Sequence, residues 1–369
     1  MKRIWTYITF LCLFFLPQNS YPSAEKFKLL DMDDGLFNNQ VRFLTQMEDG
    51  RILVYTEGMF NVYDGNRFEP LDCDLSNTLP LGMHNICMAY DGGNGLLWAK
   101  DYYRLYLFDT RTQRFCLDLK ARFQAAGLKE PLNDFILDQD KMAWLITASG
   151  KLYRYDWQHP AHMIYAPSSE EKEAGVKAKD VIQAGPFHLI FLNTGKMLCW
   201  EEKSGRMTGE DFSAATAYPS EAFRTAWLQA DNQHLLISVS HTEGYVYLYN
   251  IYTRQWKIVL KGEAINDIKK DRSGCFWLGG NNVLVKLSRD YEILEKLDWF
   301  ELTNGNRLQD FVMSLLIDEN QGLWLGTGSS GVLRMQSKKH YVEYYANDAA
   351  RNKGGRIIRS LVQYDQKHL

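Results

Sequence analysis

The sequence lacks several features that would mark other classes of protein. Its formal net charge is −3, so it has no basic excess of the kind that nucleic-acid-binding chains usually carry. It has only nine prolines in 369 residues, and no proline-rich linker divides it. With 46% apolar and 24% charged residues, it does not have the composition of a disordered chain. We therefore expect a globular protein, with no nucleic acid bound by this segment.

Long hydrophobic runs are also absent, except at the N-terminus. Residues 1–24 combine a positive start at Lys2 and Arg3 with an apolar core, Ile4–Leu16, that is shorter than a membrane span of about 20 residues. Small residues follow this core, which is typical of a secretory signal peptide. An uncleaved signal anchor is the alternative. We expect an exported protein that contacts a membrane only through an uncleaved leader or a part of the protein outside this chain.

Cysteine is scarce and irregularly placed. Five cysteines follow the leader, with wide spacings and no CxxC pair: Cys73, Cys87, Cys116, Cys199 and Cys275. This pattern disfavours a disulfide scaffold and suggests small buried side chains within strands. A bridge between Cys73 and Cys87 stays open.

Aromatic residues, by contrast, make up 14% of the chain, and they accompany a repeat. Each copy has an alternating apolar run, a turn rich in Asp, Asn and Gly, a short apolar strand, a second turn and a third strand. Four copies are clear: 41–68, 86–115, 265–293 and 312–340. Three are weaker: 135–156, 181–201 and 226–256. The second strands align on Leu53, Trp98, Trp144, Leu189, Leu235, Trp277 and Trp324.

These anchor positions recur about every 45 residues, a period typical of propeller blades with four short strands. We predict an all-β fold, a seven-bladed β-propeller with four-stranded antiparallel blades over residues 25–350. Either Phe27–Leu30 or His340–Tyr345 would complete the last blade and close the ring. Residues 351–369 begin an eighth repeat, as if a truncated second propeller followed.

The run Asp34–Phe68 resembles the two-component regulator propeller repeats. Asp271–Leu287 and Asp318–Met335 are similar to the same consensus, in which an Asp and a Gly precede a Trp and a further Gly. These repeats form the periplasmic sensor region of hybrid two-component systems (histidine kinase and response regulator) in gut Bacteroidetes. The resemblance covers nearly the whole mature chain, and the motifs are specific to the repeat.

The resemblance implies a periplasmic, non-catalytic sensor that detects glycan-derived oligosaccharides to regulate polysaccharide utilisation through a phosphorelay. Its expected partners are an oligosaccharide and either downstream signalling domains or a homodimer partner. No kinase motif follows in this chain, whereas family members continue into one. Two alternatives remain open: an exported propeller glycoside hydrolase or lyase, and a truncated product without function.

Motifs for catalysis, cofactors and metals are missing or out of context. The GTGSSG run, Gly326–Gly331, fits GxGxxG, but a strand-like VLRMQ follows where a dinucleotide site needs a helix. His159 and His162 flank Pro160, and two imidazoles rarely suffice for a closed metal site. The sequence has no HExxH, no GxSxG and no good Asp box. We expect no catalytic site, no cofactor and no metal.

Candidate ligand residues lie before or at the first strand of several repeats, where loops surround the central channel of a propeller. These polar residues are Asn38, Asn39, His84, Asn85, Asn133, Asp134, Arg307, Gln309 and Asp310. Their alternative role is turn formation. The four repeat tryptophans Trp98, Trp144, Trp277 and Trp324 are expected to pack between blades. Five tryptophans lie outside that position and are better candidates for exposure: Trp157, Trp200, Trp227, Trp256 and Trp299.

Overall fold

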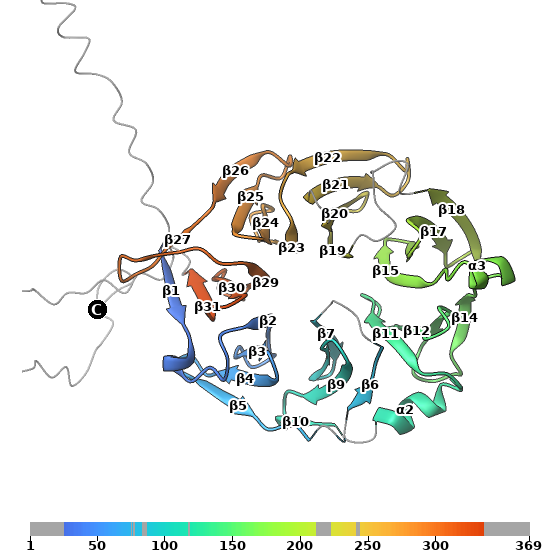
Figure 1. The fold of residues 1–369 in the computed structure, drawn as a ribbon, viewed down its shortest axis with the longest axis horizontal. Coiled ribbons are helices and arrows are strands. Elements are labelled where there is room, and N and C mark those ends of the chain that lie inside the picture. Colours follow the sequence, from blue (N-terminus) through green and yellow to red (C-terminus); the bar gives the residue numbers. More distant parts are fainter. Residues whose placement is uncertain are drawn as a thin grey trace, which may run out of the picture. The chain divides into compact units, whose positions relative to one another are not determined.

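The computed structural model describes residues 26–335, except 75, 77, 83–86, 117–118, 212–222 and 241–243. Seven of the antiparallel sheets that these residues form are arranged as the blades of a ring (Figure 1). The predicted seven-bladed β-propeller is therefore confirmed. The predicted leader (1–24), His340–Tyr345 and the eighth repeat (351–369) lie outside the described residues.

In each blade the first strand lies nearest the centre of the ring and the others follow outward (Figure 1). Blade 1 contains β2 (Val41–Gln46), β3 (Ile52–Thr56), β4 (Met59–Tyr63) and β5 (Phe68–Leu71). Blade 2 contains β7 (Met88–Gly93), β8 (Leu96–Lys100), β9 (Arg104–Asp109), β10 (Arg114–Phe115) and β6 (Leu79–Pro80). Blade 3 contains β11 (Leu132–Leu137), β12 (Ala143–Thr147), β13 (Leu152–Tyr155) and β14 (His162–Tyr165).

Blade 4 contains β15 (Ala178–Ala184), β16 (Phe187–Leu192), β17 (Lys196–Glu201) and β18 (Arg206–Asp211). Blade 5 contains β19 (Phe223–Gln229), β20 (His234–Ser240), β21 (Gly244–Asn250) and β22 (Trp256–Lys261). Blade 6 contains β23 (Ile265–Lys270), β24 (Phe276–Gly280), β25 (Val283–Leu287) and β26 (Ile293–Leu297). Blade 7 contains β29 (Val312–Ile317), β30 (Leu323–Thr327), β31 (Val332–Met335) and β1 (Phe27–Leu30).

The remaining elements all lie in connections between blades. They are the 3-10 helix η2 (Met32–Asp34), the helices α2 (Leu119–Ala125) and α3 (Ser169–Glu173), and a hairpin of β27 (Phe300–Glu301) and β28 (Arg307–Leu308). The helices α2 and α3 are thus short insertions between blades. No helix in the described part of the chain is both long and apolar enough to cross a membrane.

The hydrophobic core is divided into seven clusters, and each fills the seam between two neighbouring blades. Successive residues of a strand point to opposite faces of its sheet, so they enter different seams. In β30, Trp324 packs in the seam between blades 7 and 1, whereas Leu325 packs in the seam between blades 6 and 7. This two-sided burial explains why the second strands of blades 1, 3, 6 and 7 are buried along their whole length.

All seven predicted anchor residues lie on second strands and are at most 5% exposed. In blades 3, 6 and 7 an aspartate six residues before the Trp fixes its ring. In blade 7, Asp318 Oδ1 accepts from the Gly322 amide at 2.7 Å, and Oδ2 accepts from the Trp324 indole at 2.8 Å. The guanidinium of Arg334 on β31 lies 4.5 Å from the centre of the same ring. The repeat motif therefore encodes a turn cap and a buried, cation-stacked tryptophan.

Two glycines of the motif make room for neighbouring strands. A Cβ on Gly326 would lie 2.5 Å from Val41 Cγ1 in blade 1. Gly331 has a φ of 99° and its missing Cβ would lie 2.5 Å from the carbonyl oxygen of Leu30 in β1. Gly326 and Gly331 thus bring blade 1 and the N-terminal strand close to blade 7, and β31 follows them as a strand. The glycine-rich run is a structural turn.

The ring closes through β1, which pairs antiparallel with β31 from Phe27 opposite Met335 to Leu30 opposite Val332. This confirms Phe27–Leu30 as the closing strand.

Blade 2 differs from the prediction, because its outer strand is split: β10 and β6 pair with opposite ends of β9. β10 and β6 have two residues each. Pro80 in β6 has no amide hydrogen to donate, which limits the pairing of that strand. Cys73 and Cys87 do not form a disulfide bridge.

We expect Asp318→Ala to lower the free energy of unfolding by about 1–3 kcal/mol, because the Trp324 indole N–H would be left buried without its acceptor. Urea denaturation followed by tryptophan fluorescence measures this. Asp290→Ala, at an exposed turn of blade 6, is the control and is expected to change stability by no more than about 0.5 kcal/mol. Equal effects of the two changes would contradict the role given to Asp318.

Acid is expected to weaken the corresponding turns in blades 3 and 6, which Asp138 and Asp271 cap. Burial by itself raises the pKa of Asp138 and of Asp271. The neighbouring His188 and the Trp144 indole outweigh burial at Asp138, and hydrogen bonds from Ser273 and Trp277, among others, outweigh it at Asp271, so both pKa values lie below the usual range. Groups with a depressed pKa stabilise the fold above their unfolded pKa of about 3.9, and this stabilisation is lost as the pH falls through the folded pKa. We predict that the urea concentration at the unfolding midpoint decreases as the pH is lowered below about 4. In the double variant Asp138→Asn/Asp271→Asn this decrease with pH should be less steep. An unchanged slope in that variant would refute the prediction.

Candidate functional site

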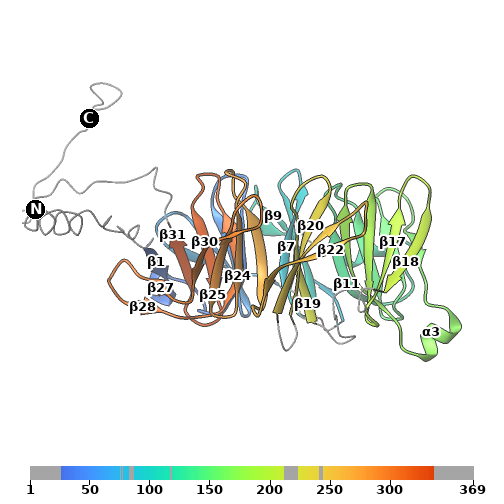
Figure 2. The same cartoon turned by 90° about the horizontal axis from the view of Figure 1, so that it is seen from above.

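The two ends of the ring are built differently. At one end, here called the turn face, tight turns join the first strand of each blade to the second. At the other end, the loop face, the chain passes from one blade to the next. Figure 2 shows α3 and the β27–β28 hairpin projecting at the loop face. Within the residues that the structure describes, long connections run through 31–40, 119–131, 166–177 and 298–311. The variable part of the repeat is thus concentrated at the loop face.

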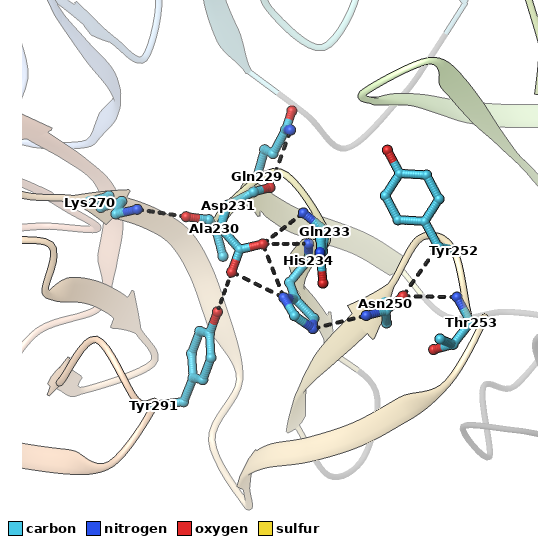
Figure 3. Close-up of polar contacts among 10 residues, drawn as sticks. All are labelled: Gln229, Ala230, Asp231, Gln233, His234, Asn250, Tyr252, Thr253, Lys270 and Tyr291. Atoms are coloured by element: carbon cyan, nitrogen blue, oxygen red, sulfur yellow. Dashed lines mark hydrogen bonds and ion pairs between the residues drawn. The ribbon is translucent and has the colours of Figure 1, made fainter.

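Contacts between neighbouring blades form a closed belt at the turn face. In Figure 3, the Lys270 ammonium of blade 6 donates to the Ala230 carbonyl of blade 5 at 2.6 Å, and the Tyr291 hydroxyl donates to Asp231 at 3.3 Å. Asp231 also pairs with His234 at 3.0 Å. The other seams are joined by Gln46–Glu319, Glu48–Gly95, Asp91–Lys141, Gln139–Gln183, Phe187–Tyr252 and Arg272–Gln321. Polar groups at this end are largely used to hold blades together.

The loop face is held by one repeated backbone bond. In blade 1 the Glu57 amide, just after the second strand, donates to the Gln40 carbonyl, just before the first strand, at 2.9 Å. Equivalent bonds join Ala148 to Pro131, Asn193 to Lys177, Asn281 to Ala264 and Gly328 to Phe311. Because the backbone fixes these turns, their side chains are free to vary. Among the described residues, five of the ten exposed large apolar side chains lie here: Met32, Phe37, Tyr103, Trp299 and Phe311.

The structure brings two groups of predicted residues together across the seam between blades 7 and 1. The turn before β31 links them: the Gly331 amide donates to the Asn39 carbonyl at 2.9 Å, and the Ser329 amide donates to Asp310 Oδ2 at 3.0 Å. Asp310 is buried, and Asn39 Oδ1 accepts from the Met32 amide at 3.1 Å. These two side chains shape the loops, and so does Asn38, whose Oδ1 accepts from the Gln40 amide at 2.8 Å.

Arg307 and Gln309 are exposed beside this seam. The Arg307 guanidinium lies 4.9 Å from the centre of the Trp299 ring, and that ring is 51% exposed. Of the five tryptophans outside the repeat position, Trp157, Trp200, Trp227 and Trp256 are partly buried and pack against core clusters. Trp299 alone among them is exposed. Arg307, Gln309 and Trp299 therefore present polar and aromatic groups to solvent.

Asn133 and Asp134 lie apart from that group, at a bulge in β11 of blade 3. Asp134 is 4% exposed and its Oδ1 lies 2.5 Å from Lys100 Nζ, which is also buried. Although burial lowers the pKa of Lys100, the Asp134 carboxylate beside it raises that pKa overall. Asp134 is thus engaged in an ion pair between blades 2 and 3, whereas Asn133 is only partly buried. His84 and Asn85 lie outside the described residues.

Sequence reasoning missed a cluster at the loop face between blades 1 and 2. Arg42, the bulged residue of β2, donates to Glu57 Oε2 at 2.7 Å, and its guanidinium lies 5.4 Å from the Tyr102 ring centre. Burial raises the pKa of Tyr102 to about 12, which keeps its hydroxyl protonated. Tyr103 beside it is 55% exposed. The signal was available in part, because Arg42 interrupts an apolar strand and the two tyrosines sit in a turn.

These residues offer planar aromatic faces next to amide, guanidinium and carboxylate groups, which is the chemistry that sugar hydroxyls and C–H faces need. In the described ranges no three His, Cys, Asp or Glu side chains gather as a metal site would require. One open hollow lies outside blade 1, away from this cluster, and its acidic groups partly serve as the cap of η2. It is bordered by Asp33, Asp34, Gly35, Asn66, Arg67, Phe68, Glu69 and Pro70.

No family model matches the chain, and no curated protein is similar to it in sequence. Among solved structures, it is similar to the extracellular domains assigned to two hybrid two-component systems of B. thetaiotaomicron. Each comparison has a TM-score of 0.61 and 16% identity over 85% of this chain, which spans 42% of the first domain and 40% of the second. Streptogramin B lyase is similar with a TM-score of 0.54 and 9% identity, over 84% of this chain and 96% of the lyase. These similarities establish the propeller fold.

We expect Asp134→Ala to lower the free energy of unfolding by about 3–5 kcal/mol, because it leaves the Lys100 ammonium buried without its partner. Adding Lys100→Met, which removes the buried charge, is expected to recover part of this loss. Chemical denaturation of the single and double variants measures both effects. A double variant less stable than Asp134→Ala would show that the charge is not what costs stability.

Proposed function

We propose that this chain is the periplasmic ligand-sensing propeller of a hybrid two-component system and that it binds glycan-derived oligosaccharides at the loop face without transforming them. The observation that carries the proposal is the asymmetry of the ring. One face is closed by contacts between blades, and the other presents long connections with exposed aromatic and polar side chains. Ligand sites commonly combine apolar surface with a few placed polar groups.

Two further observations support a sensor. The similar solved domains are assigned to extracellular parts of two-component systems, and the N-terminal pattern predicts export. A rigid propeller also suits a role in which occupancy shifts the relation between neighbouring domains. On this proposal the downstream signalling domains or a second copy of the chain would receive the signal.

The proposed site has two parts. Arg42 with Tyr102 and Tyr103 forms one at blades 1 and 2, and Trp299 with Arg307 forms the other at blade 7. Asn38, Asn39 and Asp310 shape the loops of this face, and Gln309 is exposed among them. Aromatic faces would contact the C–H surfaces of a sugar, and guanidinium and amide groups would bond its hydroxyls.

Isothermal titration calorimetry against oligosaccharide digests of starch, xylan and pectin tests the proposal. We expect one digest to bind, and Tyr103→Ala to weaken its binding about five- to thirtyfold, the factor that corresponds to 1–2 kcal/mol. Tyr252→Ala is the matched control, since Tyr252 is 58% exposed at the turn face, against 55% for Tyr103. It should leave binding unchanged.

Three outcomes would contradict the proposal. They are no binding of any digest, equal effects of the two tyrosine substitutions, and release of shorter sugars when the purified chain is incubated with the digests. The last would favour the alternative of a propeller hydrolase or lyase.

A further inference from the structure

The N-terminal strand β1 is held along both of its edges. On one edge it pairs with β31 over four residues. On the other, Phe27 forms a parallel bridge with Leu302, and the Thr303 amide donates to the Phe27 carbonyl at 2.9 Å. Thr303 lies in the turn of the β27–β28 hairpin. The hairpin therefore covers an edge that would otherwise be open.

Side chains also stabilise the contact between β1 and the β27–β28 hairpin. The rings of Phe27 and Phe300 meet edge to face, with centres 5.2 Å apart, and both are at most 1% exposed. Leu302 joins them in the cluster between blades 6 and 7, which also holds Trp277. Outside this cluster, Lys26 Nζ lies 3.3 Å from Glu301 Oε1. The start of β1 is thus enclosed by the hairpin, and its side chains fill the seam.

Blades 1 and 3–6 draw their four strands from one continuous stretch of chain, so the outer strand stays tethered by a short turn, and in blade 2 the β10 half of the outer strand is tethered in the same way. Blade 7 instead takes its outer strand from the opposite end of the described chain. A short strand without such a tether opens easily, because local opening needs only the loss of its own contacts. The contacts of the hairpin with Phe27 and Lys26 therefore add to the four-residue pairing with β31 in holding β1 in place.

We propose that the β27–β28 hairpin is a clasp, and that the ring opens as a discrete event at blade 7 in which β1, β31 and the hairpin are released together before any other seam opens. Such an opening gives the propeller a two-state element that does not require unfolding of the other blades. The proposal concerns the fold of the chain and does not depend on the identity of a ligand.

Hydrogen exchange followed by mass spectrometry on the full chain tests it. We expect peptides covering residues 27–30, 300–308 and 332–335 to exchange at one common rate, faster than peptides from β12 and β16 in blades 3 and 4. Phe300→Leu should raise this common rate about tenfold, the factor for 1.4 kcal/mol, because it loosens the packing around Phe27. Exchange in blades 3 and 4 should stay the same.

Phe276→Leu is the matched control, since Phe276 is 2% exposed in the seam between blades 5 and 6. It should leave the exchange of residues 27–30 unchanged. Wild-type protein alone can overturn the proposal, if the hairpin exchanges while β1 stays protected, or if all blades exchange at one rate. An equal rise in all seven blades on Phe300→Leu would overturn it as well.

Discussion

The whole structure depends on each blade having a neighbour on both sides. A blade sheet is apolar on its two faces, since alternate residues of one strand enter different seams, as Trp324 and Leu325 do in β30. A linear stack of blades would leave two such faces in water. Only a closed ring buries all of them, so the four residue pairs between β1 and β31 complete the burial of seven seams.

This constraint explains what the repeat motif encodes. The aspartate caps a turn and fixes the tryptophan, the cation of the third strand covers its ring, and a glycine admits a valine from the next blade. Each of these roles serves a seam. Ligand chemistry must therefore be sought where the repeat is interrupted, in the connections between blades, and the candidate site lies there.

The sequence sufficed for the fold because the seam requirements recur about every 45 residues. It left the closing strand open between Phe27–Leu30 and His340–Tyr345, because alternation alone cannot distinguish two short apolar strands. Individual site residues were harder to assign. Asp134 and Asp310 were proposed as ligand residues on residue type, but in the fold one pairs with Lys100 and the other holds the turn at Ser329. Arg42 becomes prominent only once a bulge places it at the loop face, whereas Trp299 was among five tryptophans proposed for exposure and is the one of them that is exposed.

The position of β1 also determines the order in which the blades can be completed during synthesis and folding. Phe27 and Leu30 emerge from the ribosome well before their partners Met335 and Val332, which follow only after the intervening blades have been made. Contacts so distant in sequence form late, because the chain must lose the entropy of a very long loop to make them. Six blades can assemble side by side before blade 7 is complete. Until then one apolar face of blade 1 and one of blade 6 stay exposed to chaperones or to other chains. Of the described strands, β1 is thus the first to be made and the last to pair, and until it pairs the exposed blade faces favour contacts with other copies of the chain.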